Sequence, residues 1–144
     1  MIGAFLVKKR VLDGNEALNR KDLDAFLKDW AADAVLEYPG KIPGVGGIYE
    51  GKAAIQRFYQ RDFEQFPELK ITLTHIAVTN IFDFLGNNVV FTKWEADVTN
   101  RDGYRLRNSG ITVIKIKSGK AVHVKQYIFD TGEEFNKAWG VEAM

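Results

Sequence analysis

The hydrophobic pattern of this chain changes its period near residue 70, and that change limits the folds open to it. Before this point, apolar residues recur at the three-to-four-residue spacing that is typical of helices. After it, β-branched and polar residues alternate at the spacing of two that is typical of half-buried strands. The second half therefore predicts four strands, at about 70–82, 88–99, 104–117 and 120–130.

The segments between these strands have the composition of tight turns. They read Gly86-Asn87-Asn88, Asn100-Arg101-Asp102-Gly103 and Ser118-Gly119. Glycine and asparagine accept the backbone angles that short hairpin turns require. Successive strands are therefore predicted to pair antiparallel.

Two helices are expected before residue 34. The first carries Phe5, Leu6, Leu12, Ala17 and Leu18, and Gly14 in its middle weakens it by about 1 kcal/mol relative to alanine. The second begins after Asp22, a typical N-cap residue. Its buried stripe is expected to consist of four apolar residues at helical spacing, Leu23, Phe26, Leu27 and Trp30.

A short strand at 34–38 and a third helix at 52–63 complete the first half. Pro39 and Gly40 end the strand, and Pro67 closes the helix. The stripe of this helix consists of Ile55, Phe58, Tyr59 and Phe63. The glycine-rich loop at 40–47 either covers the mouth of a cavity or serves as a connector.

Three helices followed by long antiparallel strands predict an α+β fold in which the helices pack on one face of a curved sheet. Such a sheet encloses a cone. The tail 131–144 is expected to form a loose turn or short helix, with Phe135 and Trp139 covering the edge or mouth of that cone. At 144 residues, the whole chain 1–144 is expected to be one domain.

Composition argues against several classes of function. The net charge is +1, and Lys8, Lys9 and Arg10 form the only basic run, so neither a nucleic-acid nor a membrane partner is expected. The chain has no cysteine, which excludes thiolate chemistry. The apolar start at 1–7 is too short for a signal peptide, so a cytoplasmic location is expected.

Cofactor and metal chemistry are not indicated either. His75 and His123 lie in different predicted strands, without Asp or Glu at ligand spacing. The sequence contains neither a nucleophile elbow nor a phosphate-binding loop. We therefore expect no metal and no cofactor.

Alternation along the strands predicts which side chains point into the cone, since the face without Lys and Arg should meet the helices. The last strand then turns Val122, Val124, Gln126, Ile128 and Asp130 inward. Across the three central strands, the inward polar groups are Trp94 through its indole, Asn108, Thr112, Gln126 and Asp130. A mostly apolar hollow with a few polar groups is typical of a small-molecule pocket.

Asp130 is the expected acid-base residue. A carboxylate at the inward end of a strand, among aromatic side chains, would be poorly hydrated and could exchange protons near neutral pH. The alternative is that Asp130 only caps the turn at Thr131 and Gly132.

Two segments carry a family resemblance. ALNRKDLDAFLKDWAADAVLEYPG resembles the second helix and first strand of the ketosteroid isomerase branch of the nuclear transport factor 2-like superfamily, and YEGKAAIQRFY resembles its third helix. This superfamily includes limonene epoxide hydrolase and the SnoaL-like polyketide cyclases, and it implies a cystatin-like α+β barrel.

The catalytic groups of two branches are incomplete here. Where ketosteroid isomerases keep their proton-abstracting Asp, this chain has Tyr38, and their oxyanion-hole Tyr and Asp fall at about Gly14 and at Ile111 or Thr112. Tyr127-Ile128-Phe129-Asp130 resembles the end of the last strand of limonene epoxide hydrolases, but Trp94 and Ala96 stand where these enzymes need Arg and a second Asp.

The SnoaL-like cyclases need only one late-strand Asp, and Asp130 matches it. The resemblance implies an acid-base isomerase, cyclase or hydrolase that acts on an apolar carbonyl or polyketide-like compound through Asp130. Tyr38 is expected to donate a hydrogen bond to the developing enolate. The expected substrate-binding residues are Trp94, Asn108, Thr112, Gln126, Phe58, Tyr59 and Trp30. The alternative is a non-catalytic module that binds a small apolar or aromatic molecule.

A homodimer is also implied by resemblance, because the closing YIFDTGEEFNKAWG is similar to a segment of the phenazine-biosynthesis A/B proteins. Such proteins pair through the outer face of the sheet, which here offers Phe91, Val113, Tyr127 and Phe129.

Overall fold

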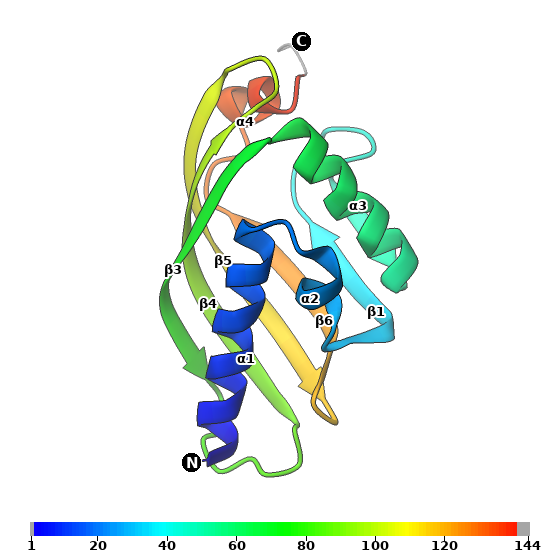
Figure 1. Ribbon diagram of the computed structural model, residues 1–144, viewed down its shortest axis with the longest axis vertical. Coiled ribbons are helices and arrows are strands. Elements are labelled where there is room, and N and C mark those ends of the chain that lie inside the picture. Colours follow the sequence, from blue (N-terminus) through cyan, green and yellow to red (C-terminus); the bar gives the residue numbers. More distant parts are fainter. Residues whose placement is uncertain (1, 141–144) are drawn as a thin grey trace.

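The computed structural model describes residues 2–140. It contains a curved six-stranded sheet with helices on its concave side (Figure 1). In chain order the elements are α1 (Ile2–Asn19), α2 (Leu23–Leu27), β1 (Trp30–Tyr38), β2 (Gly47–Glu50), α3 (Lys52–Gln65), β3 (Glu68–Val78), β4 (Asn88–Thr99), β5 (Arg105–Lys117), β6 (Lys120–Ile128) and α4 (Glu133–Ala138).

The strand order is β2-β1-β6-β5-β4-β3. Strands β3 to β6 pair antiparallel in sequence order, whereas β1 runs parallel to β6. Two of the predicted turns join β4 to β5 and β5 to β6, but β3 ends at Val78 and not at 82, so the longer loop 79–87 joins it to β4. Helices α1, α2 and α3 lie over the concave face, and α4 lies near one end of the sheet (Figure 1). The predicted α+β class with a mainly antiparallel sheet is confirmed.

Two clusters of buried side chains hold these layers together. One joins α2 and α3 to β1 and β6 through residues that include Leu27, Leu36, Ile55 and Val124. The other forms at the end closed by α4 and consists of Ile42, Val45, Phe66, Val98, Leu106, Phe135, Ala138 and Trp139. Phe135 and Trp139 are therefore core residues at the edge that the tail was predicted to cover.

The glycine-rich loop at 40–47 is packed into the second cluster. Ile42 and Val45 are buried, and the Tyr49 hydroxyl donates a hydrogen bond to the Val45 carbonyl over 2.7 Å. At Gly46 the chain turns so tightly that a Cβ would lie 2.1 Å from the Gly40 carbonyl oxygen. The loop is a packed connector, and it does not contribute to the cavity described below.

The second helix is shorter than its hydrophobic spacing predicts. Its N-cap is correct, since the Asp22 carboxylate accepts a hydrogen bond from the Ala25 N–H over 3.2 Å. It ends at Leu27, however, and Trp30 is the first residue of β1, where it pairs with Ala121. Trp30 therefore joins β1 because its backbone pairs with β6, although its spacing is helical. As a result, β1 starts before residue 34, where the strand was predicted to begin.

Two further differences come from the sheet. The four residues of β2 pair antiparallel with the end of β1, a strand that the sequence did not predict. A bulge between β5 and β6 shifts the register after Lys115, so Ala121 lines the interior. The prediction that Val122 points inward is wrong, because alternation inverts across a bulge.

The core makes a direct prediction about stability. Ile55 of α3 is 0% exposed, whereas Ile48 of β2 is 63% exposed. Replacing Ile55 with alanine should lower the free energy of unfolding by about 2 to 5 kcal/mol, because it leaves a cavity under α3. Ile48→Ala is the matched control and should stay within about 0.5 kcal/mol of the parent protein. Urea denaturation measures both, and equal losses would contradict this packing.

Candidate functional site

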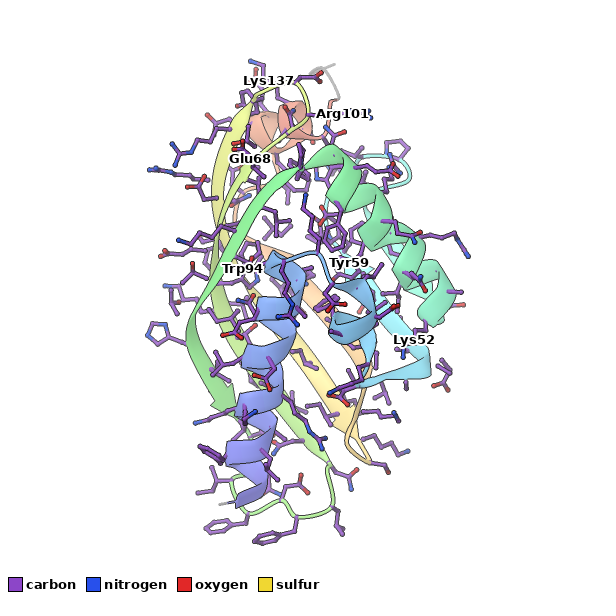
Figure 2. The ribbon with its side chains drawn as sticks, in the orientation of Figure 1. Lys52, Tyr59, Glu68, Trp94, Arg101 and Lys137 are labelled. Carbon is purple, nitrogen blue, oxygen red and sulfur yellow. The ribbon has the colours of Figure 1, made fainter. Side chains whose placement is uncertain are left out.

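A cavity of about 740 Å³ lies between the helices and the concave face of the sheet. The helices form one wall of this cavity and the sheet forms the other. Tyr59 of α3 lies in the helical wall, and Trp94 of β4 lies in the sheet wall (Figure 2). All three tryptophans of the chain, Trp30, Trp94 and Trp139, line it. Apolar side chains provide most of its wall area, as in small-molecule sites, and charged residues such as Arg10, Glu16 and Asp29 also line it.

Most of the sequence-predicted site residues come together at this cavity. Its lining includes Trp30, Tyr38, Phe58, Tyr59, Trp94, Asn108, Thr112 and Gln126. They come from β1, α3, β4, β5 and β6, so the folded sheet gathers residues that are far apart in sequence. Their binding roles stay predictions.

Asp130 does not line the cavity. It follows the end of β6, is exposed, and accepts a hydrogen bond from the Gly132 N–H over 2.9 Å. Its backbone carbonyl accepts a hydrogen bond from the Asn108 amide over 2.8 Å. The prediction that the Asp130 carboxylate points into the cone is therefore wrong, because β6 ends at Ile128 and the chain turns toward α4. The capping alternative describes Asp130 correctly.

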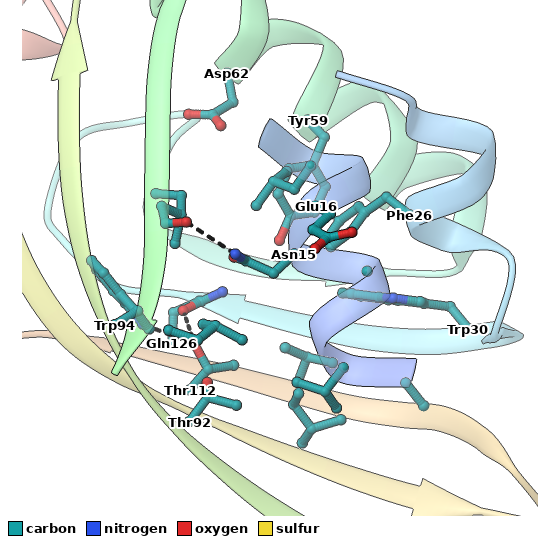
Figure 3. Close-up of a pocket in the computed structure, with 18 of the residues that line it drawn as sticks. Asn15, Glu16, Phe26, Trp30, Tyr59, Asp62, Thr92, Trp94, Thr112 and Gln126 are labelled. Atoms are coloured by element: carbon teal, nitrogen blue, oxygen red, sulfur yellow. Dashed lines mark hydrogen bonds between the residues drawn. The ribbon is translucent and has the colours of Figure 1, made fainter. Parts of the chain in front are cut away.

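A chain of hydrogen bonds crosses the sheet side of the cavity (Figure 3). The Trp94 indole N–H donates to the Thr112 hydroxyl over 3.0 Å, and that hydroxyl donates to the Gln126 carbonyl oxygen over 2.6 Å. Because the Gln126 oxygen accepts, its amide nitrogen is available to donate. Gln126 also lowers the pKa of Tyr59 in part, so the sheet wall influences a phenol on α3.

Asp62 is the cavity carboxylate that the sequence interpretation missed. It lies on α3, lines the cavity, and projects toward it below the helix (Figure 3). Within residues 2–140, no side chain lies within hydrogen-bond or salt-bridge distance of its oxygens, so the carboxylate is free for a ligand. Burial raises its pKa from 3.8 to about 7, and Lys21 partly opposes that rise.

Two tyrosines that line the cavity respond to the charge of this carboxylate. Burial raises the pKa of Tyr38 well above its usual value, and the charge of Asp62 raises it further. Burial and Asp62 also raise the pKa of Tyr59, while the hydrogen bond from Gln126 lowers it in part. Both phenols therefore keep their protons at neutral pH and can donate hydrogen bonds to an oxygen in the cavity.

Lys21 is the nearby cation, but its ammonium group is engaged elsewhere. It donates hydrogen bonds to the carbonyls of Phe66 and Pro67 over 3.1 and 2.6 Å. It also lies 5.9 Å from the centre of the Phe63 ring. Lys21 thus moderates the charge of Asp62 from a fixed position and does not form a salt bridge with it.

The sequence did contain a signal for Asp62. Ile55, Phe58, Tyr59 and Asp62 fall at positions i, i+3, i+4 and i+7 of α3, so Asp62 continues the buried stripe by one turn. The interpretation chose Phe63 for that turn because Phe63 is apolar. A carboxylate on an otherwise buried stripe is a recognisable sign of a functional group.

Two kinds of feature are absent from the part of the chain that the structure describes. Residues 2–140 contain no group of three or more His, Cys, Asp or Glu side chains that could hold a metal ion. Over the same residues, no helix has the length and apolar character needed to cross a membrane.

Comparison with known proteins gives a family match and similar structures. The family model described as a SnoaL-like domain matches residues 11–124. The uncharacterised protein YesE of Bacillus subtilis strain 168 is 27% identical over 108 residues, which are 74% of this chain and 70% of YesE.

Two solved structures share the fold. A nuclear transport factor 2-like protein of unknown function from Burkholderia pseudomallei K96243 has a TM-score of 0.78 and 20% identity, covering 91% of this chain and 95% of its own. TerC, co-crystallised with polyporic acid, has a TM-score of 0.75 and 17% identity, covering 92% of this chain and 96% of its own.

The raised pKa of Asp62 predicts a pH-dependent stability. The folded pKa of about 7 lies above the ordinary value of 3.8, so the folded state holds an extra proton between these values and loses stability as pH rises toward 7. Asp62→Asn removes this loss, and we expect the variant to gain about 1 to 2 kcal/mol over the parent between pH 5 and pH 8, since water in the cavity screens part of the penalty.

The measurement is urea denaturation of both proteins across that pH range. Glu64→Gln, an exposed substitution on the same helix, is the matched control and should follow the parent at every pH. A constant difference between Asp62→Asn and the parent would contradict the raised pKa.

Proposed function

Because the chain belongs to the SnoaL-like domain family, we propose that its cone binds a small, largely apolar carbonyl compound and that Asp62 transfers protons on it. The observation that carries this proposal is the Asp62 carboxylate, which lies without a side-chain partner in the same cavity as the protonated Tyr38 and Tyr59. The proposal moves to Asp62 the role that the sequence pattern assigned to Asp130.

The cavity supports a ligand of this class. A volume of about 740 Å³ is within the range of small-molecule sites. One wall consists of Phe26, Trp30 and Tyr59, whose rings approach one another at tilted and edge-on angles with centroids 4.9 to 6.4 Å apart. Such a wall suits a flat or aromatic molecule. That TerC was co-crystallised with polyporic acid is compatible with a ligand of this kind.

The proposed step is a proton transfer next to the carbonyl group of the ligand. Asp62 takes a proton from the neighbouring carbon, so a C–H bond breaks and an O–H bond forms on the carboxylate. The electron pair of the C–H bond moves into an enolate, and its negative charge develops on the carbonyl oxygen. In a ligand with a C=C bond next to the deprotonated carbon, the enolate extends over that bond. Return of the proton to the far carbon shifts the double bond and completes an isomerisation without net gain or loss of atoms or electrons.

The surrounding groups suit that step. A base with a pKa near 7 can both accept and return a proton at neutral pH, which is the condition for efficient acid-base catalysis. Tyr38 and Tyr59 can donate hydrogen bonds to the developing oxyanion. Thr112 and Trp94 fix the Gln126 side chain, which lowers the pKa of Tyr59 in part.

A non-catalytic binding module is the second candidate. The observation that favours it is that Trp94, Thr112 and Gln126 already satisfy one another without a ligand. A closed network of this kind stabilises a cavity of fixed shape and leaves few donors for chemistry. In this case the same apolar molecule would bind and leave unchanged.

A homodimer through the outer face of the sheet remains part of the proposal. Phe91, Tyr127 and Phe129 are exposed on strands β4 and β6 or just after β6, on the side away from the helices. Aromatic residues in this position are typical of protein interfaces.

Exchange of carbon-bound protons tests the proposed chemistry. With β-tetralone, a small aromatic ketone, in heavy water, the protein should speed the loss of the protons next to the carbonyl, as followed by proton NMR. Asp62→Asn should lower the catalysed rate at least about a hundredfold, because it removes the proposed base. Asp130→Asn is the control and should keep the parent rate.

Binding is measured separately by quenching of the tryptophan fluorescence, since all three tryptophans line the cavity. Quenching without exchange in the parent protein supports the binding module. Exchange that survives in Asp62→Asn but disappears in Asp130→Asn would contradict the role given to Asp62.

A further inference from the structure

In the loop between β3 and β4, a polar side chain is buried and apolar side chains are exposed, which reverses the usual arrangement. Asp83 is 6% exposed, whereas its neighbours Phe82, Phe84 and Leu85 are 68%, 73% and 80% exposed. Ile81 is exposed as well. Scattered single apolar residues are ordinary on a protein surface, but four within five positions of one loop are not.

Internal hydrogen bonds fix this loop. The buried Asn88 side chain accepts from the Asn80 N–H over 3.0 Å and donates to the Asn80 carbonyl over 2.8 Å. The Asp83 carboxylate accepts from the Leu85 N–H over 3.0 Å. Polar side chains therefore stabilise the loop from inside, and its apolar side chains are held outward by a defined backbone.

The loop is also attached to two neighbouring elements. The Gly119 N–H donates to the Gly86 carbonyl over 2.9 Å, which joins the loop to the β5–β6 turn. At Gly3 of α1, a Cβ would lie 1.9 Å from the Asp83 carbonyl oxygen, so the helix packs directly against the loop. Figure 1 shows the start of α1 beside this loop.

We name this surface the apolar end. It consists of Phe5 of α1 together with Ile81, Phe82, Phe84 and Leu85, all of them exposed. Because these side chains lie on two elements in contact, they form one surface that water meets directly.

Exposed lysines border the apolar end. Lys117 and Lys120 flank the β5–β6 turn, and Lys8 lies on the next turn of α1 after Phe5. Lys9 forms a salt bridge of 3.1 Å with Asp13 and so contributes little net charge. The one carboxylate within the loop, Asp83, is buried. The border is therefore basic.

We propose that the apolar end docks on an anionic lipid surface, with its aromatic and aliphatic side chains in the headgroup region and the lysines against the headgroups. Exposed aromatic and leucine side chains surrounded by lysines are the general form of an interfacial membrane contact. A symmetric contact with a second copy is disfavoured, because a two-fold axis would bring the basic border against itself. The proposal replaces the sequence-based expectation that no membrane takes part.

The position of the cavity relates this docking to ligand binding, and this relation is the purpose of docking in the proposal. Leu6 and Arg10 line the cavity and lie on α1, as does Phe5 of the apolar end. Ile116 and Gly119 also line it and lie on β5 and the β5–β6 turn, next to the lysines of the basic border. Docking would therefore turn one end of the cavity toward the bilayer, where an apolar molecule dissolves. This purpose depends on the proposed ligand, whereas docking itself does not.

Co-sedimentation with vesicles tests the docking. The parent protein should sediment with phosphatidylcholine vesicles that contain about 30% phosphatidylglycerol and much less with pure phosphatidylcholine. The double variant Phe82→Ser with Phe84→Ser should bind at least about tenfold more weakly, because it removes the inserted rings. Ile48→Ser, an exposed apolar site on the opposite edge strand β2, should bind like the parent.

A charge variant keeps the test decisive if the serine variant folds poorly. Lys117→Gln with Lys120→Gln leaves the loop intact and should also bind anionic vesicles at least about tenfold more weakly. A parent protein that fails to sediment with anionic vesicles would overturn the proposal. So would a parent dimer, measured by light scattering, that dissociates in the serine variant while lipid binding stays unchanged. Because the readout is lipid binding, these outcomes are independent of proton exchange on β-tetralone.

Discussion

The parallel pairing of β1 with β6 is the constraint on which the rest of this structure depends. It joins the first strand of the chain to the last, so the three helices of the first half must lie over the concave face of a sheet built mostly from the second half. Its first contact is the hydrogen bond from the Ala121 N–H to the Asp29 carbonyl, 2.9 Å long. Without this pair, Tyr38 and α3 would have no fixed position relative to the sheet, and the cavity would not close.

The cavity and the apolar end each contain a carboxylate that is held away from bulk water, but in opposite surroundings. In the cavity, one carboxylate is kept among apolar side chains without a partner, which makes its proton easy to exchange near neutral pH. In the β3–β4 loop, a carboxylate is buried with a backbone partner, and the apolar side chains face water. Both arrangements reduce stability locally, and functional sites commonly carry such costs.

Much of the fold could be predicted from the sequence, because it depends on local spacing and turn chemistry. Strand β4 was predicted with its observed limits, and the antiparallel pairing followed from the glycine and asparagine turns. The features that were predicted wrongly depend on pairing between residues that are far apart in the sequence. Trp30 joins β1 because β6 is there to pair with it, and Ala121 replaces Val122 inside because of a bulge. Asp130 lies outside because β6 stops two residues earlier, whereas Asp62 was visible in the helical spacing and was overlooked.

The proposed chemistry depends on Asp62, a cavity carboxylate whose proton exchanges near neutral pH. The most direct measurement is a carbon-detected NMR titration of the carboxyl groups of the parent protein, with Asp62→Asn used to assign the signal. The account predicts that the Asp62 carboxyl carbon titrates with a midpoint at about 7. A midpoint close to the ordinary value of 3.8 would contradict it, because a well-hydrated carboxylate would then occupy the position given to the base.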